Sequence, residues 1–530
     1  MKKYINYIPF FLLLLASACK QDVIDLQEPV TETVTPETPS KGTADFTKFV
    51  SIGNSLTAGF QAGALFTAGQ QNSFPAIMAK QFTTVGGSTT FNQPDINSVN
   101  GYNSSFSDPG EGIILGRLIL FSTTGNQSDA LPTPAGYPGV PAPYNTADLP
   151  APYTGDKSKL NNFGVPGIIL AQVLTPATGG PNIPQNPAYN PLYARFASSP
   201  SPDGSSGSSI ISDAIAAQPT FFSFDLGNND VLGYATTGGD GSIGLTKTSD
   251  FQTYYNMAIG ALLNPATNPN NPKGVVSTIP DVTNIPFFYT ISWNAIPLDA
   301  ATAGAVTTQL ANGYNGFLTQ MKSYGIITQE EFDKRTLTYA AGQNSILISD
   351  TDLTDLSPYM TGPAAALAPY ALARQTTATD LVTLTAGSVL GTEIDGNPSR
   401  VYGVTVPIGD KYILVPSEID SIETATAAFN EIIKGVGTTY SQIAVADVNA
   451  EFKSLFNAHF KISNGVTITP DFAPPTGAFS EDGVHPNTRG YAYLANIFID
   501  AINAKFTAKV PKASLADYPG TGLPIVVKIN

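Results

Sequence analysis

The sequence contains very few of the side chains that form disulfides or bind zinc. Its 530 residues include one cysteine and two histidines. The single cysteine, Cys19, excludes a disulfide within the chain, and so few thiols and imidazoles disfavour a zinc site. Calcium held by Asp and Asn oxygens stays open, although no segment has the spaced acidic residues of a calcium-binding loop. We therefore expect no metal and no cofactor.

Positive charge is scarce as well. The 26 lysines and arginines are outnumbered by 41 aspartates and glutamates, which gives a formal net charge of -15. Because nucleic-acid binding depends on clustered Lys and Arg side chains, this composition disfavours a nucleic-acid partner.

Hydrophobic residues make up 42% of the chain, enough for a buried core. The length exceeds what one core usually needs, so a second domain or large insertions are expected.

Long apolar runs are confined to the N-terminus, and no later stretch reaches the roughly 18 apolar residues that span a bilayer. Two lysines precede the apolar run at 8–15, and small residues at 16–18 precede Cys19. This arrangement resembles a bacterial lipoprotein signal, with Ala16 where such signals usually have leucine. We expect a cleaved signal peptide at 1–18 and a lipid anchor on Cys19. An ordinary signal peptide followed by an unrelated cysteine is the alternative.

The segment after the signal is predicted to be a flexible tether at 19–43, rich in Glu, Thr and Pro. Lys20 follows the anchor where an inner-membrane lipoprotein would have aspartate, so we expect an extracytoplasmic, outer-membrane location. One domain is predicted at 44–510, with a C-terminal tail at 511–530. Three loop-rich or mixed segments are expected to be insertions into that domain. They lie near 101–160, 176–209 and 351–412.

Apolar patterns in the predicted domain indicate alternating strands and helices. Residues 46–52 have strand character and end at a glycine, and apolar residues at helical spacing follow at 74–82. Strands that alternate with helices predict an α/β fold whose parallel sheet is covered on both faces. Further strands are predicted at 221–226, 286–291, 345–349 and 443–448, and an amphipathic helix at 421–434.

One of the two histidines lies in a pattern that suits proton transfer. An imidazole is the side chain best suited to move a proton near neutral pH, and Asp482 lies three residues before His485. Asn487 or Thr488 can cap the helix that follows, which places the histidine on a loop at the start of that helix. Such a pair also occurs by chance, so it gains meaning only beside a nucleophile. His459 ends a helical stretch and is interpreted as a histidine at the C-terminus of that helix, not as a second base.

A candidate nucleophile follows the first predicted strand. Ser55 lies in the segment GNSLTAG at 53–59, where the carboxyl end of a parallel strand presents its ligands. Thr57 occupies the place of the second glycine in the G-x-S-x-G elbow of α/β-hydrolases, so a different architecture is needed. A serine that only caps the next helix is the alternative interpretation.

Four short blocks in the same order resemble those of the SGNH or GDSL hydrolases. They are GNSLTAG at 53–59, NFGVPG at 162–167, LGNND at 226–230 and DGVHP at 482–486. Each block is weak alone, but four independent matches in order are specific. The resemblance runs from 46 to about 505, and the insertions are not matched. It implies a flavodoxin-like three-layer α/β/α sandwich with a central parallel sheet.

The resemblance also implies roles for particular residues. Ser55 matches the nucleophile, and Asp482 and His485 match the orienting acid and the base. The backbone N–H groups of Ser55 and Gly167 and the amide of Asn229 match the oxyanion hole, which stabilises the charge of an acyl-transfer transition state. The family usually has aspartate where this chain has Asn54, which puts the loop geometry and the pH profile in question.

These matches lead to one main hypothesis about function. It is an extracytoplasmic, lipid-anchored serine ester hydrolase, an esterase or lipase-like acylhydrolase that forms an acyl-enzyme intermediate. Its expected partners are a small-molecule, lipid or glycan ester and, through the anchor, a membrane. A carbohydrate O-acetyl esterase is one alternative, because the same triad serves an acetyl group. A surface lipoprotein that binds a ligand without catalysis, or an inactive family member, is the other.

Overall fold

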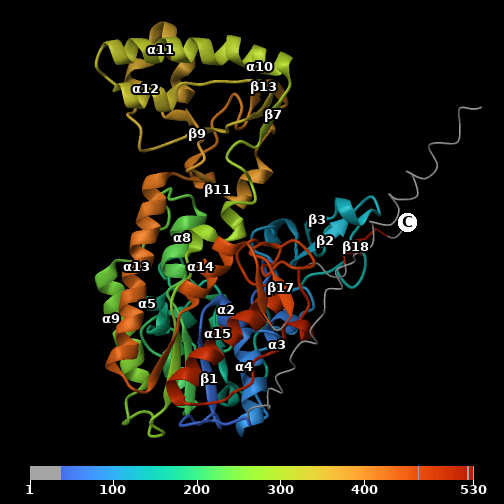
Figure 1. Ribbon diagram of the computed structural model, residues 1–530, viewed down its shortest axis with the longest axis vertical. Coiled ribbons are helices and arrows are strands. Elements are labelled where there is room, and N and C mark those ends of the chain that lie inside the picture. Colours follow the sequence, from blue (N-terminus) through green and yellow to red (C-terminus); the bar gives the residue numbers. More distant parts are fainter. Residues whose placement is uncertain (1–37, 464, 522–524, 529–530) are drawn as a thin grey trace, which may run out of the picture. The chain divides into compact units, whose positions relative to one another are not determined.

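The computed structural model describes residues 38–463, 465–521 and 525–528. The predicted signal peptide, Cys19 and most of the predicted tether lie outside the described residues. The described residues from Pro39 onward belong to one unit, whose helices and strands are drawn in Figure 1. This unit has two large hydrophobic cores. The larger core surrounds a central sheet, and the smaller core belongs to a lobe formed by residues 291–415.

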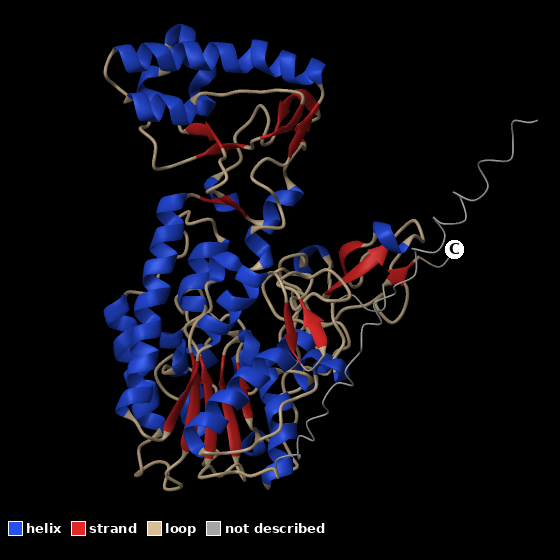
Figure 2. Cartoon of the chain, in the orientation of Figure 1, coloured by secondary structure: helices blue, strands red, loops and turns tan. Residues whose placement is uncertain are grey.

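A five-stranded, all-parallel sheet lies at the centre of the larger core (Figure 2). In spatial order its strands are β15 (Ile443–Ala446), β6 (Lys273–Ser277), β5 (Phe221–Asp225), β1 (Phe49–Gly53) and β4 (Asn162–Gly164). Numbered along the chain, the order is 5-4-3-1-2, a common doubly wound order. The predicted α/β class with a parallel sheet is confirmed. The chain reverses direction across the sheet between β1 and β5, and ligands bind beyond the carboxyl ends of the strands at such a point.

Helices cover both faces of this sheet. Phe221 of β5 packs on Phe82 and Phe506, which belong to one group of helices. Phe224 packs on Tyr255 of the other group. Because successive side chains of a strand point to opposite faces, the two groups lie on opposite faces. The first group is α4 (Phe74–Phe82), α14 (Val448–Ala458) and α15 (Thr488–Phe506), and the second is α7 (Ile210–Ala216), α9 (Thr248–Leu262) and α13 (Pro416–Thr439).

Three of the predicted strands, at 46–52, 221–226 and 443–448, lie in the central sheet as β1, β5 and β15. The strand predicted at 286–291 is wrong, because Pro286–Phe288 forms a 3₁₀ helix. Its phenylalanines are buried in the larger core, so the apolar run reflects burial without strand pairing. The fourth strand of the central sheet, counted along the chain, is β6, which the sequence analysis did not predict.

The sequence of β6, KGVVS, carries a weak strand signal because it begins with lysine and glycine. The glycine has a packing reason. A side chain on Gly274 would meet the ring of Phe222 on the neighbouring strand, 2.5 Å from its Cβ. Tertiary packing therefore requires glycine at this position, although glycine is unfavourable in a strand.

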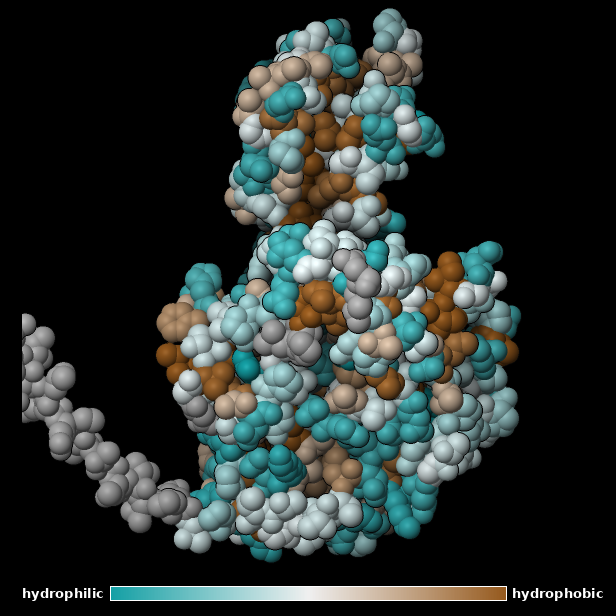
Figure 3. All heavy atoms as spheres, turned by 90° about the vertical axis from the view of Figure 1, so that its right-hand side faces the viewer, coloured by the Kyte–Doolittle hydropathy of each residue, from teal (hydrophilic) through white to brown (hydrophobic). Residues whose placement is uncertain are grey.

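The lobe at 291–415 begins well before the insertion predicted at 351–412. The strand predicted at 345–349 corresponds to β9 (Leu347–Ser349), which pairs antiparallel with β10 (Ala373–Gln375) in the lobe and not with the central sheet. Figure 3 shows the apolar side chains of the lobe between more polar ones. Its helices are α10 (Ala300–Val306), α11 (Asn312–Ser323) and α12 (Gln329–Arg335), and its other strands are β7 (Ile296–Leu298), β8 (Gly342–Asn344), β11 (Leu381–Val382), β12 (Glu393–Ile394), β13 (Asn397–Val401) and β14 (Ile413–Leu414).

The segments predicted as insertions at 101–160 and 176–209 contain only short elements. Residues near both ends of the described part of the chain pack on the larger core: the Ser40 N–H donates to the Lys509 carbonyl, and Leu515 is buried. Among the described residues, no helix combines the length and hydrophobicity needed to cross a bilayer. The remaining elements are α2 (Ser55–Ala58), α3 (Thr67–Gln71), α5 (Leu170–Val173), α6 (Pro191–Ala194), α8 (Asn229–Thr236), β16 (Lys461–Ser463), β17 (Val466–Ile468) and the sheet of β18 (Val526–Val527), β2 (Leu118–Ser122) and β3 (Leu131–Pro134).

Candidate active site

Ser55 is the first residue of α2, directly beyond the carboxyl end of β1. The turn between them is tight. A side chain on Gly53 would lie 2.0 Å from the Thr57 Oγ1 and 2.6 Å from the backbone oxygen of Asp225. Asn54 caps α2, because its Oδ1 accepts a hydrogen bond from the N–H of Leu56 at 2.8 Å. These contacts fix the turn that carries Ser55 at the edge of the sheet.

His485 reaches Ser55 from the loop that precedes α15. Its Nε2 lies 2.9 Å from the Ser55 Oγ, and its Nδ1 lies 2.9 Å from the Asp482 Oδ2. Asn487 caps α15 by accepting the Gly490 N–H at 2.9 Å, which fixes the loop at its C-terminal side. The fold thus brings together two side chains that are 430 positions apart in the chain.

The carboxylate of Asp482 is held by donors on both oxygens. Its Oδ1 accepts the N–H groups of Val484 and His485, each at 2.9 Å, and the Ser480 hydroxyl at 3.1 Å. Its Oδ2 accepts the Gly63 N–H at 2.8 Å. Burial raises the pKa of Asp482, but the charge of His485 and the hydrogen bonds outweigh it and lower the pKa to about 2. Asp482 is therefore ionised at neutral pH and accepts from Nδ1.

This charge state determines which nitrogen of His485 can act as a base. When Nδ1–H donates to Asp482, Nε2 carries a lone pair that faces the Ser55 hydroxyl. Phe60 packs on the imidazole with ring centroids 4.9 Å apart. The arrangement can remove a proton from Ser55 and return it to another oxygen.

The predicted oxyanion donors come from the ends of three neighbouring strands. Ser55 is the first residue of its helix, where backbone N–H groups have no partner within the helix. Gly167 lies in the loop after β4, which is attached to the turn before Ser55 because the Val165 N–H donates to the Gly53 carbonyl at 2.9 Å. No acceptor for the Gly167 N–H is found within the part of the chain that the structure describes.

Asn229 is the first residue of α8, beyond the carboxyl end of β5. Its Nδ2 donates one hydrogen to the Ile168 carbonyl at 2.8 Å, and the second hydrogen stays available. Asn229, Ser55 and His485 line one cleft of about 40 Å³. Its other walls are mostly apolar: Leu56, Leu232, Pro280, Val282, Ile285 and Val484.

Two buried aspartates near the site were missed by sequence reasoning. Asp225 ends β5 and accepts the Ser277 hydroxyl at 2.6 Å, while its other carboxylate oxygen has no partner among the described residues. Burial raises the pKa of Asp225 to about 6, despite the hydrogen bond from Ser277. Burial likewise raises the pKa of Asp230 to about 6, and its carboxylate accepts the Leu170 N–H, three residues after Gly167. The sequence signal for both was their position on either side of the LGNN segment at 226–229.

The second histidine lies outside this site. His459 ends α14 as its C-terminal cap with a left-handed backbone, φ 59°, so the prediction of a helix C-terminal histidine is confirmed. Within residues 38–463, 465–521 and 525–528, no group of three His, Cys, Asp or Glu side chains is arranged to hold a metal ion. No protein-family model matches the chain, and no curated protein is significantly similar to it.

Proposed function

We propose that the protein is a serine ester hydrolase of the SGNH type. The observation that carries the proposal is the line of contacts from the Ser55 Oγ through the imidazole of His485 to the Asp482 carboxylate, with 2.9 Å at each step. A serine that only capped a helix would have no need of a base held at hydrogen-bond distance by an ionised, buried carboxylate.

The position of the site in the fold supports the same proposal. The strand order agrees with a flavodoxin-like three-layer sandwich. Three of the four sequence blocks lie at the carboxyl ends of β1, β4 and β5, and the fourth lies in the loop before α15. All four therefore converge beside the point where the chain reverses direction across the sheet.

In the proposed reaction, the Ser55 Oγ attacks the ester carbonyl carbon while its proton passes to Nε2 of His485. The carbonyl oxygen becomes an oxyanion, which the N–H groups of Ser55 and Gly167 and the second hydrogen of the Asn229 amide stabilise. When this intermediate collapses, His485 gives its proton to the departing alcohol oxygen. Water, deprotonated by His485, then attacks the acyl-enzyme, and the carboxylic acid leaves as Ser55 regains its proton.

The proposal is tested by labelling and turnover. A fluorophosphonate probe should label Ser55 of the wild-type protein, as located by peptide mapping. Ser55→Ala should lose both labelling and hydrolysis of p-nitrophenyl acetate while its circular dichroism spectrum is unchanged. Undiminished hydrolysis by this variant rejects Ser55 as the nucleophile. A wild-type protein that is neither labelled nor active favours a surface lipoprotein that binds a ligand without catalysis.

We also propose that Cys19 carries a lipid and attaches the enzyme to a bacterial membrane outside the cytoplasm, based on the signal pattern at 1–19. Cells grown with a radiolabelled or alkyne-tagged fatty acid should incorporate it into the wild-type protein and not into Cys19→Ala. Equal incorporation by both would contradict the anchor.

A further inference from the structure

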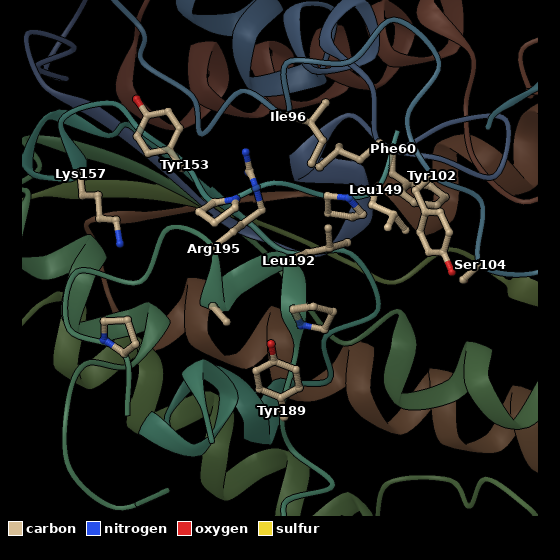
Figure 4. Close-up of a pocket in the computed structure, with 16 residues that line it drawn as sticks. Phe60, Ile96, Tyr102, Ser104, Leu149, Tyr153, Lys157, Tyr189, Leu192 and Arg195 are labelled. Atoms are coloured by element: carbon tan, nitrogen blue, oxygen red, sulfur yellow. The ribbon is translucent and has the colours of Figure 1, made fainter. Parts of the chain in front are cut away.

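A large cavity lies beside the candidate active site and is separate from the small cleft that contains Ser55. Its volume is about 780 Å³, within the range of small-molecule binding pockets. All but three of its lining residues, Phe60, Leu65 and Ile96, belong to the two segments predicted as insertions at 101–160 and 176–209. Figure 4 shows that side chains from these segments face each other across the cavity.

The cavity wall is attached to both sides of the candidate active site. Phe60 lines the cavity and packs on the ring of His485, and its N–H donates to the Ser55 carbonyl at 3.0 Å. On the other side, the Asn190 amide donates at 2.9 Å to the carbonyl of Pro166, the residue before Gly167. The neighbours of Asn190 in the chain line the cavity. The cavity wall is therefore in contact both with the ring of His485 and with the loop that carries Gly167.

The chemistry of the lining favours an apolar occupant. No aspartate, glutamate, asparagine or glutamine contributes to it, although the whole chain is acidic. Its two cations are already used in the structure: Arg195 donates to the carbonyls of Ala151, Pro94 and Asp95, and Lys157 donates to the Ala197 carbonyl. The other polar lining groups are three tyrosines and Ser104. The lining thus offers few hydrogen-bond partners for the many hydroxyls of a sugar, whereas an apolar group needs none.

We propose that this cavity binds an extended apolar group of the ester substrate, so that the enzyme acts on esters with a long hydrocarbon chain or a large apolar alcohol. This inference rests on the proposed function. Burying one methylene group favours binding by about fourfold. If six methylenes beyond acetate enter the cavity and are partly buried, kcat/KM should rise at least 100-fold.

Two substrate series decide which part of the ester enters the cavity. The acyl series runs from p-nitrophenyl acetate to p-nitrophenyl decanoate, and the alcohol series from methyl acetate to octyl acetate. A rise in kcat/KM along the acyl series assigns the cavity to the acyl chain, and a rise along the alcohol series assigns it to the alcohol. A flat profile in both series, or a preference for acetylated sugars over the longest esters, overturns the proposal.

Variants that fill the cavity test whether the cavity is responsible. Leu192→Trp replaces an aliphatic lining side chain with a bulkier indole ring and should lower the ratio of long-chain to short-chain kcat/KM at least tenfold. Leu149 is 53% exposed, so Leu149→Trp should do the same with little risk to the fold. Met257→Trp on α9, 55% exposed and outside the lining, is the matched control and should keep the wild-type ratio. An unchanged ratio in both cavity variants overturns the proposal.

A binding measurement separates failure of this inference from failure of the proposed function. Decanoic acid and decanol are titrated into Ser55→Ala by calorimetry, which needs no turnover. Binding of either one, weakened at least tenfold when Leu192→Trp is added, supports the cavity assignment even if the wild-type protein hydrolyses no ester. Hydrolysis of p-nitrophenyl acetate with no binding of either compound leaves the proposed function standing and overturns the cavity assignment.

Discussion

Replacing the buried carboxylate of Asp482 by an amide gives the sharpest test of the proposed proton transfer. Both carboxylate oxygens accept donors: three on Oδ1, and the Gly63 N–H and the His485 Nδ1 on Oδ2. In Asp482→Asn, either orientation of the amide turns its NH₂ group toward donors. The least costly relief is for His485 to accept from the amide at Nδ1, which moves the ring hydrogen to Nε2.

The changed tautomer removes the base, because Nε2–H then faces the Ser55 hydroxyl. For a serine hydrolase whose triad aspartate is changed in this way, kcat falls about 10⁴-fold. That loss corresponds to about 5.5 kcal/mol of transition-state stabilisation. We therefore expect p-nitrophenyl acetate hydrolysis by Asp482→Asn to fall by about 10⁴-fold at neutral pH.

The same substitution affects stability with a defined pH dependence. The pKa of Asp482 falls from an ordinary 3.8 to about 2 in the fold, so the ionised carboxylate contributes about 2 kcal/mol above pH 3.8. This contribution is lost as the pH falls through 2. At pH 7, Asp482→Asn should therefore unfold at a lower urea concentration than the wild type.

The control for this experiment is Asp500→Asn. Asp500 lies on the exposed side of α15, where its ion pair with Lys512 contributes little. Its rate and stability should stay close to those of the wild type. A loss of activity below tenfold in folded Asp482→Asn would refute the role of Asp482 as the group that orients His485.

Three further predictions follow from the site. Asn229→Ala should lower kcat for p-nitrophenyl acetate by about 10²–10³ with an unchanged KM, the usual cost of one oxyanion donor, and a loss below tenfold would remove Asn229 from the oxyanion hole. Burial raises the pKa of Asp225 from 3.8 to about 6, so the protonated carboxyl group stabilises the fold below pH 3.8. This stabilisation is lost as the pH rises through 6. Asp225→Asn keeps a neutral side chain at every pH, so urea unfolding should show it up to about 3 kcal/mol more stable than the wild type at pH 8 and equal to it at pH 3.5, and equal stability at both would contradict the assignment. Gly53→Ala should cost about 1–3 kcal/mol of unfolding free energy, because the added Cβ meets the Asp225 backbone, and an unchanged urea midpoint would contradict the close approach.

Sequence reasoning succeeded where a local pattern was enough. The apolar runs of β1, β5 and β15 are flanked by glycine or helical segments, so their strand character is visible without the fold. It failed where tertiary packing overrode the pattern. The Pro-Phe-Phe run at 286–288 is apolar because it is buried, and β6 carries a glycine that makes room for Phe222.

The chemistry of the residues could be anticipated from the sequence. A serine after a strand, and an aspartate three residues before a histidine, are local patterns whose side chains have a known reactivity. The short Asp482–His485 contact also follows from local spacing, because the two residues lie within one turn of the chain.

The tertiary structure alone decided the contact between Ser55 and His485, and the cavity beside them. Ser55 lies beyond the carboxyl end of β1 and His485 lies in the loop before α15, so the contact depends on the packing of α15 against β15 and α4, which no local pattern specifies. Likewise, the walls of the cavity come from two separate loop segments. No hydrophobic pattern in the sequence predicts that these two segments lie close together, because loops are positioned by packing against the sheet and not by their own hydrogen-bond pattern.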